Sequence, residues 1–213
     1  MKSPRMFVAF AIGVMTVFLL ARTVLASPAE EARQTLSTAI SKILNEIKNP
    51  GWSNPEKRAQ LRKGVENEVN RVFDFDEFSA RTVGQRWKSF SPEEKKRFSA
   101  AFAQLLFNTY LNKITGYNGE QVEYLGETTQ NNPPRVEVKT AITMKDGKKT
   151  PVSYRMLPKD GSWRVYDVVI ENMSLVKNYR TQFNDILRDA TPAELIGRVE
   201  KRAQEIQAEG GQK

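Results

Sequence analysis

The sequence predicts an α+β fold in which helices precede and follow an antiparallel sheet. Apolar residues recur at helical spacing in residues 28–115, alternate with polar residues in residues 121–170, and return to helical spacing after residue 172. Two Asp-Gly pairs, at residues 146–147 and 160–161, separate alternating segments in the way that hairpin turns do. The order of these segments indicates one connected core.

The composition removes several classes of chemistry. The chain has 213 residues, which is room for one domain, and it contains neither His nor Cys. Disulfides, thiolate nucleophiles, Cys/His zinc sites and imidazole general bases are therefore excluded. We expect no catalytic residue, no metal and no cofactor, and we expect a protein that binds or carries.

The first 26 residues have the three regions of a secretory signal peptide. Lys2 and Arg5 give a positive start, residues 6–20 form an apolar run, and Val24-Leu25-Ala26 fits cleavage after Ala26. An uncleaved anchor helix is the alternative, but the run is short for a bilayer span of about 20 residues. We therefore expect the mature protein to be exported and soluble.

Removal of that segment changes the charge. The whole chain carries a net charge of +8, but residues 1–26 hold three basic residues and no acidic one, which leaves +5. This mild charge and the lack of a nucleic-acid motif predict no nucleic-acid partner. We expect a single domain over residues 27–208, a flexible tail over residues 209–213, and a monomer.

Four of the predicted helices begin with a capping side chain followed by proline, which suits the first helical position because no N–H donor is needed there. These starts are Ser27-Pro28, Asn54-Pro55, Ser91-Pro92 and Thr191-Pro192. In three of them, a Glu three residues after the cap completes a capping box. A short helix begins at Asp74 or Asp76, and another begins at Asn172 or Ser174.

The helix from Pro92 to about Thr115 differs from the others because its apolar residues cover more than one stripe. They are Phe98, Phe102, Leu105, Leu106, Phe107, Tyr110, Leu111 and Ile114. Such a helix is buried on most sides or lines an apolar space. We expect it to cover the apolar face of the sheet and to end at Gly116 and Gly119.

The alternating region predicts a four-stranded antiparallel meander. Val122 and Tyr124 mark the first strand, and residues 136–144, 152–156 and 163–170 form the other three. Such a sheet, curled around a large apolar helix, packs solid or encloses a cavity, and the pattern alone leaves both open. A cavity would suit a lipid carrier, since burial of apolar ligand is worth about 0.8 kcal/mol per CH₂.

Asp167 supports an alternative function of a different class. It is flanked by apolar residues in the last strand, which is the pattern of a general base in a small α+β isomerase. The competing interpretation places Asp167 and Glu171 on the other face of the sheet. There they would pair with Arg164, with Arg180 or with the cap of the following helix.

Lysines gather at the predicted hairpin turns. Lys145, Lys148 and Lys149 surround the Asp146-Gly147 turn, and Lys159 precedes the next one. They indicate either docking to an anionic lipid surface or acidic partner, or an ordinary solvated turn.

The last strand and the helix after it carry the most specific pattern. It reads Trp163-Arg164-Val165-Tyr166-Asp167-Val168, then Glu171-Asn172-Met173-Ser174-Leu175-Val176, then Asn178-Tyr179-Arg180 and Phe183. Earlier parts are Phe73-Asp74-Phe75, Val83-Gly84, and Trp87 before Ser91-Pro92-Glu93-Glu94. From about Pro28 to Ile206, the chain resembles the periplasmic phospholipid-shuttle family of the Mla (maintenance of lipid asymmetry) pathway, also called the toluene-tolerance or ABC-transporter auxiliary family.

The resemblance implies a deep apolar pocket between a curved sheet and helices, with acyl tails buried and the headgroup facing solvent. It implies a periplasmic carrier that shuttles phospholipid between an outer-membrane lipoprotein complex and an inner-membrane complex with an ABC transporter. It implies no hydrolytic chemistry. Some members are associated with hopanoid biosynthesis, so a polycyclic lipid is the alternative cargo.

The periodicity suggests which residues line such a pocket. From the helix we expect Phe98, Phe102, Leu105, Leu106 and Tyr110, and from the sheet Val138, Ile142, Tyr154 and Val168. The sheet residues depend on strand register, because a shift of one residue turns a strand's set to the other face. Tyr179 and Phe183 are expected to clamp the last helices to the sheet.

Overall fold

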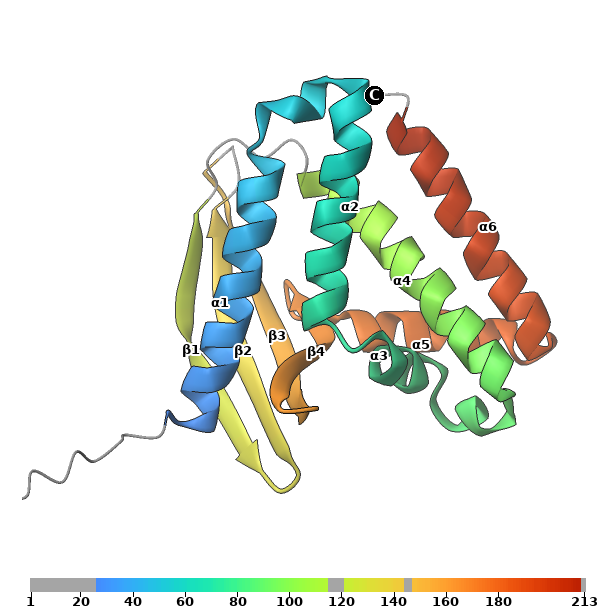
Figure 1. Cartoon of the computed structure of the whole chain (residues 1–213). Coiled ribbons are helices and arrows are strands. Elements are labelled where there is room, and N and C mark those ends of the chain that lie inside the picture. The colour runs from blue at the N-terminus through green and yellow to red at the C-terminus, as the bar shows by residue number, and fades with distance from the viewer. Residues whose placement is uncertain (1–25, 115–120, 144–146, 212–213) are drawn as a thin grey trace, which may run out of the picture.

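The computed structural model describes residues 26–114, 121–143 and 147–211, with helices before and after one sheet (Figure 1). The helical elements are α1 (Pro28–Ile47), η1 (Pro50–Ser53), α2 (Pro55–Val72), α3 (Phe75–Val83), η2 (Gly84–Ser89), α4 (Pro92–Ile114), α5 (Leu175–Ile186) and α6 (Pro192–Gly211), where η denotes a 3₁₀-helix. The strands are β1 (Val122–Asn131), β2 (Pro134–Thr143), β3 (Lys149–Lys159), β4 (Ser162–Ile170) and β5 (Met173–Ser174). The predicted α+β fold is confirmed.

Some predictions fall at the limits of the described residues. Residues 1–25 of the predicted signal peptide, Gly116, Gly119 and Asp146 lie outside them. Among the residues that are described, no helix combines the length and the apolar character needed to cross a bilayer. Helix α6 continues to Gly211, past residue 208, where the sequence predicted the end of the domain.

The predicted caps start the helices. The backbone N–H of Ser91 donates to Glu94 Oε2 at 2.9 Å, and the N–H of Glu94 donates to Ser91 Oγ at 3.1 Å. Thr191 and Glu194 repeat this arrangement at the start of α6. At the start of α1 only one of the two capping-box bonds is formed: the backbone N–H of Glu30 donates to Ser27 Oγ at 3.2 Å. Local side-chain chemistry thus sets where these helices begin.

The sheet is antiparallel in the order β1-β2-β3-β4-β5, with five strands rather than the predicted four. The β3–β4 turn has Asp160 at φ 50° and Gly161 at φ 72°, the left-handed pair that a two-residue hairpin needs. Glu171 at φ 48° and Asn172 at φ 68° form a second such turn, which leads into β5. The sequence did not indicate that turn because it contains no glycine.

Helix α4 is buried on most sides, as predicted, but the expectation that it covers the sheet is wrong. Helix α1 lies along the sheet, and α4 packs on α6 and α3 (Figure 1). Polar bonds explain this position. Asn108 of α4 donates to the carbonyl of Ala203 in α6 at 2.7 Å and accepts from Arg62 of α2. Gln104 of α4 donates from its Nε2 to Glu66 Oε1 of α2.

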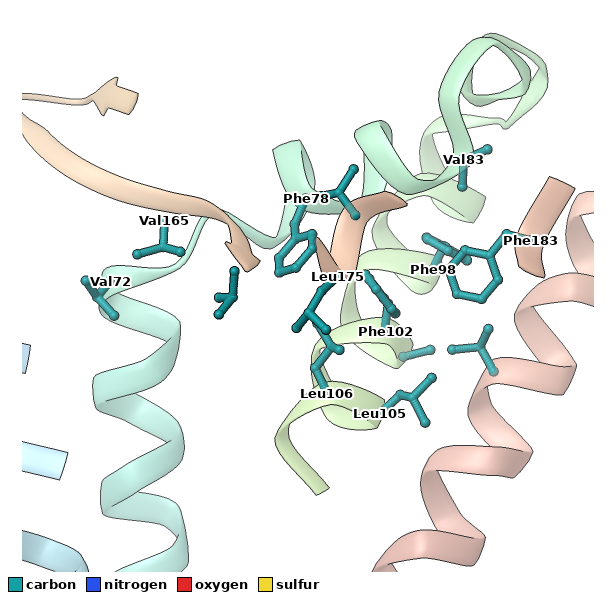
Figure 2. Close-up of a cluster of buried hydrophobic side chains, with 14 of the residues drawn as sticks. Val72, Phe78, Val83, Phe98, Phe102, Leu105, Leu106, Val165, Leu175 and Phe183 are labelled. Atoms are coloured by element: carbon teal, nitrogen blue, oxygen red, sulfur yellow. The ribbon is translucent and has the colours of Figure 1, made fainter. Parts of the chain in front are cut away.

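The apolar core has two parts. The larger cluster joins the inner face of the sheet to α1, α2, α3, α4, α5 and α6, and Figure 2 shows a portion of it. The smaller one, between α1, α2 and α4, consists of Ile47, Val65, Phe107 and Leu111. The larger cluster contains every side chain predicted to line a pocket.

Candidate functional site

The strand register brings the predicted sheet residues to one face. Val138 is the partner of Tyr154, and Tyr154 is the partner of Val168, so the three form a row across β2, β3 and β4. Ile142 lies on the same face of β2, four residues beyond Val138, because side chains alternate along a strand. All four pack in the cluster that joins the sheet to the helices.

Burial changes along this inner face. At one end Val136, Met156 and Val165 are at most 1% exposed. At the other end Tyr124 and Ile142 keep part of their surface accessible, as does Ile170 of β4. The apolar face is therefore closed at one end of the strands and accessible at the other.

Side-chain burial also decreases along helix α4, from its N-terminal half towards Tyr110. Phe98 and Phe102 are fully buried, and their rings lie 5.8 Å apart. Phe78 of α3 and Phe183 of α5 surround them at 5.4–5.6 Å, so these side chains form a tightly packed aromatic group (Figure 2). Farther along the helix Tyr110 is half-buried. Leu105 and Leu106, at 5% and 6% exposed, lie between the two regions.

Tyr179 and Phe183 make a different connection from the predicted one. The Tyr179 ring lies 4.9 Å from that of Phe102, and the Phe183 ring lies 5.4 Å from it. These ring contacts join α5 to α4, whereas the sequence analysis expected them to clamp α5 to the sheet. The difference follows from the position of α4 among helices.

Four tyrosines place hydroxyl groups at this apolar surface. Burial raises the pKa of Tyr110 and Tyr124, raises that of Tyr154 well above its ordinary value, and raises that of Tyr179 to about 12. Tyr124 adds to the shift at Tyr154, and Tyr110 adds to the shift at Tyr179, so the phenols lie in two neighbouring pairs. All four are neutral hydrogen-bonding groups at neutral pH.

Two of the accessible residues on the sheet were not among those predicted from the sequence. Tyr124 and Ile170 lie in one cross-strand row with Thr140 and Val152, next to the row of Tyr154. Both belong to the alternating pattern, and Ile170 stands two residues after Val168, so the period of two would have selected them.

Asp167 lies on the other face of the sheet and is only 2% exposed. Its Oδ2 accepts from the Ser174 hydroxyl at 2.7 Å and from Arg155 Nη1 at 3.1 Å. Its Oδ1 accepts from the backbone N–H of Val176 at 3.0 Å. Glu137 holds the other side of Arg155, at 3.5 Å from Nε. Asp167 therefore joins β3 and β4 to the start of α5 and has a structural role.

This arrangement agrees with the interpretation that places Asp167 at the helix cap, although its cationic partner is Arg155 rather than Arg164 or Arg180. Glu171 pairs with Lys148 at 2.8 Å. A carboxylate bonded on both oxygens has little capacity left to accept a proton from a substrate.

The lysines near the turns also face carboxylates. Lys149 pairs with Glu123 at 2.7 Å, and Lys159 pairs with the buried Asp74 at 2.8 Å. Lys145 lies outside the described residues. The pairs of Lys148 and Lys149 are on the surface and contribute little to stability, whereas Lys159 reaches a buried carboxylate. Because these lysines already face carboxylates, the interpretation of solvated turns is favoured over a docking patch.

A sheet with an apolar inner face, lined by helices and hydroxyl-bearing rings, defines a small α+β binding protein rather than an enzyme. The family model described as MlaC protein matches residues 37–201, so the chain belongs to the MlaC family of lipid-binding transport proteins. The resemblance to the Mla and toluene-tolerance family is confirmed.

Individual relatives are distant but cover most of the chain. The intermembrane phospholipid transport system binding protein MlaC of Haemophilus influenzae is 22% identical over 193 residues, 89% of each chain. Toluene tolerance protein ttg2D of Pseudomonas putida is 22% identical over 179 residues, 82% of this chain and 81% of that one. A solved phospholipid-binding protein from Ralstonia solanacearum, in complex with a phospholipid, matches with a TM-score of 0.73 and 24% identity. That match covers 83% of this chain and 98% of the other, and it confirms the fold.

Proposed function

We propose that this protein is a phospholipid carrier whose cargo tails lie between the inner face of the sheet and the helices. The observation that carries the proposal is the gradient along that face, from the closed end at Met156 to the accessible end at Tyr124 and Ile142. An acyl chain entering at the accessible end would meet apolar side chains along its length.

Tyr154 supports a recess at this place. Its side chain keeps accessible surface, yet burial raises the pKa of its phenol well above the ordinary value. A ring that is both partly accessible and strongly desolvated would suit the bottom of a recess. Its row neighbours Val138 and Val168 are almost fully buried, so they would form the floor.

Burial of an acyl chain can supply the binding free energy of such a site without any reactive side chain. Each buried CH₂ contributes about 0.8 kcal/mol, so a chain of a dozen carbons supplies most of the binding free energy. The phosphate, which is costly to bury, would stay in water. The hydroxyls of Tyr124 and Tyr154 would donate to ester oxygens near the accessible end.

The names of the relatives support the same cargo. The Haemophilus relative is named for intermembrane phospholipid transport, and the Ralstonia structure contains a phospholipid. We extend this to a periplasmic protein, exported by the signal peptide of residues 1–26. It would receive and deliver lipid at an outer-membrane lipoprotein complex and at an inner-membrane ABC-transporter complex.

Organic extraction of the purified protein, followed by mass spectrometry, tests the cargo. We expect about one phospholipid per chain. Ile142→Trp should fill the accessible end and empty the protein of lipid. Leu125→Trp is the matched control, because Leu125 is 55% exposed on the neighbouring strand and should leave the lipid in place.

Three results would contradict the proposal. The first is a protein that carries no lipid and takes none from liposomes. The second is a hopanoid extract, which would assign the cargo to the polycyclic alternative. The third is equal lipid content in Ile142→Trp and wild type, which would place the cargo elsewhere.

A further inference from the structure

A hollow of about 400 Å³ lies where α3, η2 and α5 meet. It is lined by Gly84, Gln85, Arg86, Arg180 and Asn184. Two of the lining side chains carry guanidinium groups, two carry amides, and none is a carboxylate. The lining therefore presents several hydrogen-bond donors and two positive charges to whatever enters.

The guanidinium of Arg180 is fixed before any ligand arrives. Its Nε and Nη2 both donate to the carbonyl of Arg81, at 2.8 and 2.5 Å. These bonds hold the plane of the group at the end of α3 and leave Nη1 and the second N–H of Nη2 for another acceptor. A donor already held in place loses little side-chain freedom on binding, which favours affinity.

The backbone at Gly84 makes room for this arrangement. Gly84 has φ 69° and ψ −135°, a conformation that only glycine adopts without strain. It ends α3 and starts η2, which carries Arg86 to the same hollow as Arg180. A Cβ at Gly84 would stand 3.8 Å from Arg180 Nε, so the backbone lies directly beside the guanidinium.

The positive charge of the hollow is not neutralised. Within the described part of the chain, neither Arg86 nor Arg180 forms an ion pair. Lys148, Lys149 and Lys159, which the sequence analysis considered for docking, all face carboxylates. Among the described residues, these three lysines are therefore paired, whereas the two arginines of the hollow are not.

We propose that this hollow is a docking site for a glutamate or aspartate side chain from an acidic segment of a partner protein. Charge complementarity and the planar guanidinium groups fit a carboxylate, which arginine binds through two parallel hydrogen bonds. The concave shape suits a projecting side chain. The amides of Gln85 and Asn184, which also line the hollow, supply further donors.

Two other sources of negative charge, an anionic bilayer surface and the headgroup of the cargo lipid, fit this hollow less well. A bilayer surface would require apolar anchors, but the exposed large hydrophobic residues of the described chain, Leu125 and Met173, lie on strands β1 and β5. The headgroup of the proposed cargo would be at the accessible end of the sheet. In Figure 1 that end of β1 and β2 lies at the top, and α3 and α5 lie at the lower end.

Nuclear magnetic resonance tests the site on the full mature chain. The probe is an acetylated and amidated hexaglutamate peptide, titrated into ¹⁵N-labelled protein. We expect saturable shifts of the Gly84 amide and of the Arg180 Nε–H signal. Arg86→Gln should weaken binding about tenfold, since it removes one of two charged partners. Lys201→Gln removes the same charge from the exposed surface of α6 and should leave the affinity unchanged.

The cargo is measured in the same samples. Arg86→Gln should keep its phospholipid, so loss of peptide binding would not be confused with loss of the carrier function. Equal weakening by Lys201→Gln would overturn the proposal, because it would show only general attraction between charges. Shifts at Gly84 with phosphatidylglycerol vesicles and none with the peptide would also overturn it, in favour of a membrane contact.

Discussion

The Asp167 carboxylate accepts a hydrogen bond from the Ser174 hydroxyl at 2.7 Å, across the turn that follows β4. Ser174 is also the N-cap of α5, and its Oγ accepts from the backbone N–H of Lys177 at 3.1 Å. Strand β4 and helix α5 are therefore joined by one continuous set of hydrogen bonds. The sheet and the start of the helix should lose stability together when this set is broken.

Asp167→Asn tests that connection. The substitution removes the charge that pairs with Arg155 and replaces one acceptor oxygen by an NH₂ group. We expect the free energy of unfolding in urea to fall by about 2–4 kcal/mol. Glu171→Gln, at an exposed position, should change it by less than about 0.5 kcal/mol. Folded Asp167→Asn that retains wild-type stability would contradict the structural role.

Asn108 gives a second prediction about polar contacts. Its side chain connects α4 to Arg62 of α2 and to the Ala203 carbonyl of α6. Asn108→Ala should lower the free energy of unfolding by about 2–3 kcal/mol, because the half-buried guanidinium of Arg62 loses its partner. The exposed amide of Gln182 is the control, and Gln182→Ala should cost less than about 0.5 kcal/mol. Equal losses in both variants would contradict the connection.

The gradient of burial along the apolar cluster predicts that substitutions at its two ends act differently on stability and on lipid retention. Phe102→Ala opens a cavity in the closed aromatic group and should cost about 3–5 kcal/mol of stability. Ile142→Ala, at the accessible end, should cost about 1–2 kcal/mol and reduce the phospholipid that remains through purification. The measurements are urea denaturation of delipidated protein and lipid per chain. A large stability loss at Ile142 with unchanged lipid would show a solid core there.

The tyrosines predict how stability depends on alkaline pH. Burial raises the pKa of Tyr179 to about 12 and that of Tyr154 further, whereas unfolded phenols ionise near pH 10. Above about pH 10 the unfolded chain binds fewer protons than the native one, so the free energy of unfolding falls as pH rises. The stabilisation is complete below about pH 9 and declines from about pH 10 to about pH 12. Tyr154→Phe should make this decline shallower in denaturation curves measured across that range.

The start of the mature chain can be checked by mass spectrometry. Export from a bacterial host should yield a protein that begins at Ser27, with residues 1–26 removed. Replacing Ala26 by a large residue, as in Ala26→Trp, should block cleavage, because the signal peptidase site requires small side chains. Recovery of the full-length chain from wild type would show that the segment is an uncleaved anchor.

Features that depend on neighbouring residues were predictable from the sequence. The caps at Ser91 and Thr191 satisfy the first N–H groups of their own helices, and the Asp160-Gly161 turn closes its own hairpin. Once the turns are placed, the register follows, and with it the row of Val138 and Tyr154.

Features that depend on distant residues were not predictable. An apolar helix needs a cover, but its pattern does not say whether the cover is a sheet or other helices. Phe102 was therefore expected beside the sheet, and its ring in fact meets Phe78 and Tyr179. The helix cap was a correct partner for Asp167, but its cationic partner was misassigned for a related reason, since Arg155 lies in another strand and reaches it only through register.

The saturation of Asp167 has a consequence for the direction of transport. With its oxygens committed to Ser174, Val176 and Arg155, the carboxylate that most resembled a general base is unavailable for chemistry. A carrier that binds and releases its cargo unchanged does no work on it. Net flow through such a passive carrier follows the difference in lipid chemical potential between the donor and the acceptor. Reversing that difference would reverse the flow without any change in the carrier.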